Sequence, residues 1–393
     1  MTEEMSECRS GGNRCGLNPV KAPPRIRIDR NELAGAFGDI GTDLPLIVGM
    51  ILASGIDGAS VLGVFGLFQV FSALVYGLPM AVQPLKAVAA IVIVNQVNGG
   101  ILFGAGLAIG LVMLALTLTG WLEGLARLVP KPVIRGIQFG LGLQLALLAL
   151  GRYVPAGGPI GFVLAGLSAL IVLALWGNRK CPASLLVVAL GVGYAALFHR
   201  TSLSFWASCG LTLPQWHVPH AGEVLTGFVM LALPQIPLSL GNSILATRQI
   251  AQDYFPDRPV TVSRLGLTYS ILNLTAPFLS GIPVCHGSGG IAGHYTFGAR
   301  TGGSVLIYGL VLLTAGLLFS RAFTDLLRVF PLPVLGTILF FEAFALMRLL
   351  RDLRASRADL GVAVAVGLMA AFLPYGYLAG LVAGSVAVYV YKN

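Results

Sequence analysis

The sequence predicts an all-α polytopic membrane protein with about 14 transmembrane segments, arranged as a seven-plus-seven inverted repeat. Three observations lead to this fold class. Of the 393 residues, 56% are hydrophobic and only 10% charged, whereas soluble domains carry roughly 25% charged residues. Apolar stretches follow one another with only short breaks. Short motifs from the first half also recur, in the same order, in the second half.

The apolar stretches are long enough to cross a bilayer, which takes about 20 apolar residues, or fewer where other helices surround the segment. The third and tenth are short and interrupted by Gly and Pro, so we expect half-helices there, each preceded by a short extended stretch. The predicted segments are 36–54, 60–76, 83–98, 101–121, 133–150, 160–176, 182–198, 224–245, 265–280, 288–298, 304–320, 331–348, 360–373 and 376–391.

The basic residues predict the orientation of these segments. With the N-terminus in the cytoplasm, 20 of the 25 Lys and Arg residues fall on the inner side and four on the outer side. Cytoplasmic loops of membrane proteins carry such an excess. The net charge of +9 therefore reflects topology, and no nucleic-acid partner is implied. We expect a multi-pass protein of the cell (plasma) membrane with both termini cytoplasmic.

The N-terminal segment is polar and basic, and no apolar run follows it as in a cleaved signal peptide. We expect a disordered cytoplasmic tail over residues 1–31 and a membrane transport domain over 32–393. Cys8 and Cys15 lie in this tail, and the five cysteines lack the spacing of a disulfide framework.

The repeat is read from four matches at nearly constant spacing. Each match alone is weak evidence for a repeat, but four matches in the same order are not. Seven segments per copy is an odd number, so the second copy enters the membrane from the opposite side. Inverted repeats with broken helices are typical of secondary transporters that bind their substrate near the midplane. We expect repeat one over about 32–198 and repeat two over about 224–391; the matches are 77–80 with 281–284, Gln69 with Asn273, 130–133 with 331–334, and 44–46 with 236–238.

The two broken segments are the expected substrate site. Pro79 and Pro84 cannot both lie inside one regular helix, so we predict extended chain and then a half-helix opening near Pro84. The partner segment reads alike, with Ser288 as a candidate N-cap. Irregular backbone is tolerated at membrane depth only inside protein or along a cavity. The candidate substrate-binding residues here are Gln83, Lys86, Ser288, Gly289 and Gly290.

Lys86 favours an anionic substrate. A lysine at the bilayer centre costs at least about 2.5–3.5 kcal/mol, and the positive end of a helix adds to that cost. An anion held between the two half-helix ends would resolve both problems. The alternative is that Lys86 pairs with Asp39 or Asp43.

Further polar residues lie within the predicted segments. Asp39 and Asp43 are four apart, hence on one helix face. With Glu342, the one acid of the twelfth segment, they are the candidates for proton coupling. Gln235 and Asn242 belong to one polar stripe and are added to the substrate-binding candidates.

Other polar or small residues have simpler explanations. Gly136, Gly140, Gln138 and Gln144 are expected to reflect close helix packing. Cys285 and His286 are adjacent and so seldom aim at one atom; we expect packing or a ligand contact. His217 and His220 flank a proline in the outer loop 199–223 and do not form a helical metal pair. We expect no metal, no cofactor and no catalytic residue.

With these motifs on the page, the chain resembles the molybdate transporter family of the sulfate permease superfamily over about residues 32–391. The matching stretches are 38–42, 79–86, 136–140, 233–238, 283–290 and 297–300. The resemblance implies the inverted fold shared with uracil and sulfate carriers, with core and gate subdomains. Sulfate permeases continue into a cytoplasmic STAS domain, and none is expected here. Asp43 stands where the family has a hydrophobic residue.

The expected function is secondary active import of a tetrahedral oxyanion, most of all molybdate, by proton symport. A sulfate or tungstate transporter and a passive anion channel of the same fold are the alternatives. A uracil-type permease fits less well because Lys86 suits an anion. An intramembrane hydrolase is the remote alternative, since no Gly-x-Ser-Gly or His-Glu-x-x-His pattern occurs. The other expected partners are membrane lipid and a second copy in a homodimer.

Overall fold

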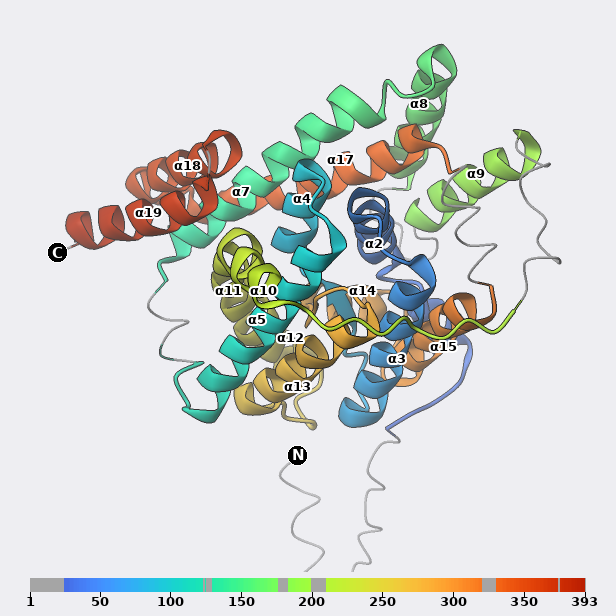
Figure 1. The fold of residues 1–393 in the computed structure, drawn as a ribbon, viewed down its shortest axis with the longest axis horizontal. Coiled ribbons are helices and arrows are strands. Elements are labelled where there is room, and N and C mark those ends of the chain that lie inside the picture. Colours follow the sequence, from blue (N-terminus) through green and yellow to red (C-terminus); the bar gives the residue numbers. More distant parts are fainter. Residues whose placement is uncertain are drawn as a thin grey trace, which may run out of the picture.

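The computed structural model describes residues 25–122, 124, 129–175, 183–198, 210–319, 330–373 and 375–392. The described chain is almost entirely helical, and its helices form two groups that lie along opposite sides of the view in Figure 1. We call them the first and the second bundle. Five helices are long and apolar enough to cross a membrane, and further apolar helices have 10–17 residues. The predicted segments coincide with helices of the described chain, and the third and tenth coincide with a strand followed by a helix or with a short helix.

The first bundle contains the helices from both halves of the chain that surround the broken segments. α3 packs against α15, and α5 packs against α13 and α10. One continuous helix, Ala221–Tyr254, comprises α10, α11 and α12 with π-helical turns at Phe228–Ala232 and Ser239–Ala246. The members are α1 (Arg30–Ala36), α2 (Ile40–Ser54), α3 (Gly58–Tyr76), α4 (Lys86–Asn95), α5 (Gly99–Leu118), α10 (Ala221–Gly227), α11 (Leu233–Leu238), α12 (Thr247–Tyr254), α13 (Val262–Thr275), α14 (Ser288–Thr296) and α15 (Gly303–Leu318).

The second bundle holds the remaining helices. α7 packs against α17 and α18, and α17 also packs against α8. A π-helical turn, Ala149–Tyr153, extends α7, and a 3₁₀ segment, Leu349–Leu353, extends α17. The members are α7 (Lys131–Leu148), α8 (Gly158–Ala174), α9 (Ala183–Phe198), α17 (Leu332–Arg348), α18 (Arg357–Phe372) and α19 (Gly376–Lys392). The bundles meet where α4 and α11 contact α7 and where α2 contacts α17.

Two short strands cross at the centre of the first bundle. β1 (Val82–Pro84) pairs antiparallel with β2 (Val284–His286), with Gln83 opposite Cys285. Each strand is secured by an amide side chain that both donates to and accepts from one backbone unit. Gln69 does so at Val82, with distances of 2.7 and 2.9 Å. Asn273 does so at Val284, with distances of 2.7 and 3.0 Å.

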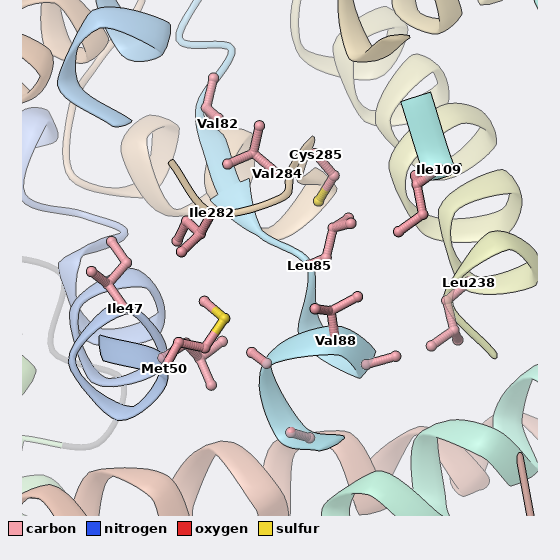
Figure 2. Close-up of a cluster of buried hydrophobic side chains, with 14 of the residues drawn as sticks. Ile47, Met50, Val82, Leu85, Val88, Ile109, Leu238, Ile282, Val284 and Cys285 are labelled. Carbon is pink, nitrogen blue, oxygen red and sulfur yellow. The ribbon is translucent and has the colours of Figure 1, made fainter. Parts of the chain in front are cut away.

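Apolar side chains enclose this crossing. Figure 2 shows Ile47 and Met50 of α2 on one side of the paired strands and Ile109 and Leu238 on the other. Between them, Leu85 and its neighbours in the strands are almost fully buried. The strand backbone groups are thereby shielded from lipid and paired within the protein, as non-helical chain at membrane depth requires.

The two half-helices begin within two residues of the predicted positions, α4 slightly later and α14 slightly earlier. α4 starts at Lys86 with Leu85 as its N-cap residue, two positions after the expected opening at Pro84. Pro84 instead is the last residue of the strand, because it pairs with Val284 of β2. α14 starts at Ser288, and its N-cap residue is Gly287. The prediction of Ser288 as N-cap is therefore wrong, and no side chain of the described residues caps this helix.

The end of the predicted tail is ordered. Residues 1–24 lie outside the described chain, but from Arg25 onward the backbone lies against the first bundle. Arg25 donates to the carbonyl groups of Leu74 and Val75, and Thr301 accepts from the Arg27 N–H. Arg25 and Arg27, which belong to the predicted tail, are therefore bonded to the first bundle.

Glycines let helices inside each bundle touch backbone to backbone. A Cβ atom added at Gly66 in α3 would lie 2.4 Å from the Leu313 nitrogen in α15. A Cβ atom added at Gly136 in α7 would lie 2.6 Å from the Ala363 oxygen in α18, and Gly140 has the same relation to Gly367. The expected packing role of Gly136 and Gly140 agrees with these contacts.

We expect Gly136→Ala to lower the thermal unfolding midpoint of the purified protein in detergent. The added methyl group must push α7 away from the backbone of α18, and overpacking of this kind typically costs about 1–3 kcal/mol. Gly166→Ala in α8 is the control, because nothing lies within 4 Å of the added atom. Equal midpoints for the two variants would contradict a tight α7–α18 contact.

Candidate functional site

A small polar cavity lies where the bundles meet. Its volume is about 280 Å³, at the small end of the range for ligand pockets. Six of the seven predicted substrate-binding residues line it: Gln83, Lys86, Gln235, Asn242, Ser288 and Gly289. The seventh, Gly290, does not; it packs against the Asp39 carboxylate and Ala81.

Lys86 lies in the first turn of α4 and forms an ion pair across the two bundles. Its Nζ donates to Glu342 Oε1 of α17 at 2.9 Å. The side chains keep 32% and 15% of their exposure, so the pair is not fully buried, and Lys86 lines the cavity. The sequence suggested Asp39 or Asp43 as the alternative partner, and this was wrong. Lys86 and Glu342 lie 256 residues apart, beyond the reach of local patterns.

Asp39 is joined to the strand crossing through Gln83. The Gln83 Nε2 donates to both carboxylate oxygens of Asp39, at 2.8 and 2.6 Å. Both side chains are almost fully buried. A change in the charge of Asp39 would therefore act directly on Gln83, which lines the cavity.

Asp43 has no such partner. It lies in the first turn of α2 and is fully buried, and among the described residues neither of its carboxylate oxygens has a hydrogen-bond donor. An unpaired buried carboxylate is costly unless a proton or a cation neutralises it. The sequence placed Asp39 and Asp43 on one face, and the structure places both at the start of α2.

The starts of the two half-helices differ. Gln235 Oε1 accepts from the N–H groups of Ala87 and Val88, at 3.0 and 3.3 Å, and so caps α4. The expectation of free N–H groups at this helix was therefore partly wrong. The Gln235 amide in turn donates to Ser239, which bonds to Tyr269.

At α14 the N-terminus remains without a side-chain cap, and Ser288 and Gly289 line the cavity. The partial positive charge of a helix start and its unpaired N–H groups attract anions. The nearest atom to a Cβ added at Gly289 is Gln83 Nε2, 4.0 Å away. The cavity therefore extends to the backbone of this helix turn.

Gly289→Leu is expected to reduce substrate uptake into proteoliposomes at least roughly tenfold, because the new side chain occupies the space beside Gln83. Gly289→Ala, which adds one methyl group in open space, should have a much smaller effect. Both variants should elute normally in size exclusion, since neither Cβ meets the backbone. Unchanged uptake by the leucine variant would remove the α14 start from the site.

The sequence missed two cavity residues on α7. The sequence proposed no substrate role for Arg135 and assigned Gln138 to helix packing, yet both line the cavity. Their spacing of three residues puts them on one helix face, and the start of α7 at Lys131 would have shown that Arg135 belongs to the helix. Gln144 fits the packing role, since it contacts α18 and Tyr377.

Strand geometry separates Cys285 from His286. Cys285 lines the cavity, while His286 points the other way and bonds to Thr268 at 2.8 Å. Alternate residues of a strand face opposite sides. This agrees with the expectation that the adjacent Cys285 and His286 do not act together on one atom. His217 and His220 both lie beside Glu223 at the start of α10.

A lysine, an uncapped helix start and amide groups around a small cavity between apolar helices can hold an anion. The model of the family described as "Molybdate transporter of MFS superfamily" matches residues 31–145 and 227–346, more than half of the chain. The chain belongs to this molybdate transporter family.

Individual relatives agree. The chain is 28% identical to molybdate transporter 2 of Arabidopsis thaliana, over 90% of this chain and 86% of the relative. It is 28% identical to molybdate transporter 1 of Chlamydomonas reinhardtii, over 92% of each.

Two solved structures share the fold. The transmembrane domain of a cyanobacterial bicarbonate transporter, BicA, superposes with a TM-score of 0.65 at 19% identity, covering 90% of this chain and 96% of that one. The murine anion transporter Slc26a9 in its inward-facing state gives 0.68 at 14% identity, covering 99% and 75%. The relatives and the two solved structures are transporters and not enzymes. This agrees with the prediction from the sequence of this chain.

Proposed function

We propose that this protein imports a tetrahedral oxyanion by secondary active proton symport across the cell membrane, and that this oxyanion is molybdate. The single observation that carries the substrate class is Lys86, an intramembrane cation that faces a small cavity beside an uncapped helix start. The family relation favours molybdate within that class. Sulfate and tungstate share its charge and shape.

The arrangement of the helices supports a seven-plus-seven inverted repeat for this carrier. The contact of α3 with α15 has a counterpart in α5 with α13, and that of α2 with α4 has one in α12 with α14. The matching roles of Gln69 and Asn273 at the two strands fit the same relation. In this scheme both termini lie in the cytoplasm.

The substrate site would consist of groups from both strands and both half-helices. Lys86 offers a compact positive charge, and Ser288 and Gly289 offer the start of α14. Gln83 and Asn242 offer amide groups, and Gln235 acts behind them by capping α4. Hydrogen bonds to an ionised partner contribute about 1.5–3 kcal/mol each, so a few of them suffice for specific binding.

The carboxylates support a carrier over a passive channel, since acids beside the site would only weaken anion conduction. Asp39 acts on Gln83 and Asp43 lacks a partner, so protons that reach them would favour the anion. Glu342 would be released from Lys86 when the anion arrives.

The test is molybdate uptake into proteoliposomes, with sulfate and tungstate as competitors and uracil as a neutral control. The proposal would be overturned if the reconstituted protein transported none of the three oxyanions, molybdate, sulfate and tungstate.

A further inference from the structure

Two buried hydrogen-bond donors belong to side chains that line the cavity and have no partner among the described residues. Among the described residues, Arg135 Nε and Gln138 Nε2 are buried atoms without an acceptor, and both side chains line the cavity. Gln138 is only 1% exposed. A buried donor left unpaired costs about 1–3 kcal/mol, so these groups call for an acceptor that the cavity would supply.

Their mutual contact sets the direction of the free donors. Arg135 Nη1 donates to Gln138 Oε1 at 2.9 Å. The oxygen end of the amide is therefore occupied, and the free end is the NH₂ group. Arg135 Nη2 pairs with Asp352 of the 3₁₀ segment after α17, which leaves Nε as the unpaired guanidinium donor.

We propose that Arg135 and Gln138 form a second oxyanion subsite in the same cavity, on α7 of the second bundle. It rests on the proposed function and adds to it a site that faces Lys86 from the other bundle. An anion has acceptors only, and the two free groups are donors only. An arginine beside an amide NH₂ suits an oxyanion, because the planar guanidinium presents its N–H groups in fixed directions.

The subsite extends the role of the bundle boundary. Lys86 belongs to the first bundle and Arg135 to the second, and their helices α4 and α7 are in contact. An oxyanion has several oxygens, so it can accept from both sides at once. Occupancy of the cavity would then join the bundles through the substrate.

The experiment measures binding of labelled molybdate to the purified full-length protein, with sulfate as competitor. Gln138→Glu keeps an acceptor for Arg135 and replaces the free donor with a carboxylate. Arg135→Gln removes the cation. We expect each to weaken molybdate binding roughly ten- to a hundredfold, with a normal elution profile.

Two controls separate recognition from stability. Asp352→Asn breaks the same ion pair but keeps the Arg135 cation, so binding should be unchanged or tighter. Arg152→Gln removes an exposed positive charge from the extension of α7 and should also leave binding unchanged.

Three outcomes would overturn the subsite. Wild-type affinity in both Gln138→Glu and Arg135→Gln would show that the anion does not touch α7. An equal loss in Asp352→Asn would assign the effect to the ion pair alone. Absence of binding by the wild-type protein would instead remove the proposed function, and the subsite with it.

Discussion

Lys86→Gln is expected to abolish oxyanion uptake while the protein stays folded. The variant removes the cation that faces the cavity from α4 and leaves Glu342 without its ion-pair partner. Removing one partner of a buried, hydrogen-bonded charge pair at a binding site costs about 2–5 kcal/mol of binding free energy, which corresponds to a loss of roughly one to four orders of magnitude in affinity. The measurement is molybdate binding and uptake by the purified, reconstituted protein.

The unpaired Glu342 could itself repel the anion, so the double variant Lys86→Gln/Glu342→Gln is the matched control. It restores a neutral pair but not the cation, and we expect no recovery of uptake. Glu342→Gln alone should keep binding, because Lys86 is then free for the substrate. Lys86→Arg should also be impaired, since a planar guanidinium does not replace a compact ammonium. Normal affinity in Lys86→Gln would remove this residue from the site.

Asp39→Asn is expected to uncouple uptake from the pH gradient. Moving a dianion against a negative-inside potential costs about 2.3 kcal/mol per charge per 100 mV, hence about 4.6 kcal/mol. At least two cations must accompany it for electroneutral entry. A carboxylate that gains a proton as the anion arrives links the two binding events. The asparagine keeps an acceptor for Gln83, so the strand crossing should remain intact.

The measurement is molybdate accumulation in vesicles with an imposed pH gradient, with and without a sodium gradient. Asp39→Asn should still bind and exchange molybdate but should not concentrate it. Asp43→Asn should have a smaller effect, since its carboxylate contacts neither Gln83 nor Lys86. If sodium drives accumulation in the wild type and the pH gradient does nothing, the proton assignment is wrong.

Composition and short motifs were enough to predict helices, the extended stretches and six of the sixteen residues that line the cavity. Each of these depends on local chemistry: apolar length makes a helix, and two prolines five residues apart break one. The partner of Lys86 depends instead on how α4 meets α17, which no local pattern encodes. The same holds for the direction of Gln138. Whether that amide faces a neighbouring helix or the cavity is decided by the rotation of α7 against α18.

Helix starts were less predictable than helix positions. Ser288 is a good N-cap residue by type. Strand β2 ends at His286, however, so Gly287 is the N-cap residue and Ser288 is the first residue of the helix. Pro84 suits a first helical turn, yet pairing with Val284 keeps it extended. In both places the long-range strand pairing outweighs a local preference, because it satisfies backbone groups that have no water to turn to.

The glycine contacts have a mechanical consequence. Where backbones touch, as between Gly66 and Leu313 or between Gly136 and Ala363, one helix cannot slide past the other without a steric clash. Across the bundle boundary, the one glycine contact found in the described chain is with a side chain, the Ile134 methyl group near Gly241. Because side chains can change rotamer, we expect this boundary to yield more easily than the backbone contacts inside each bundle. A displacement of one bundle against the other would then move the walls of the cavity apart.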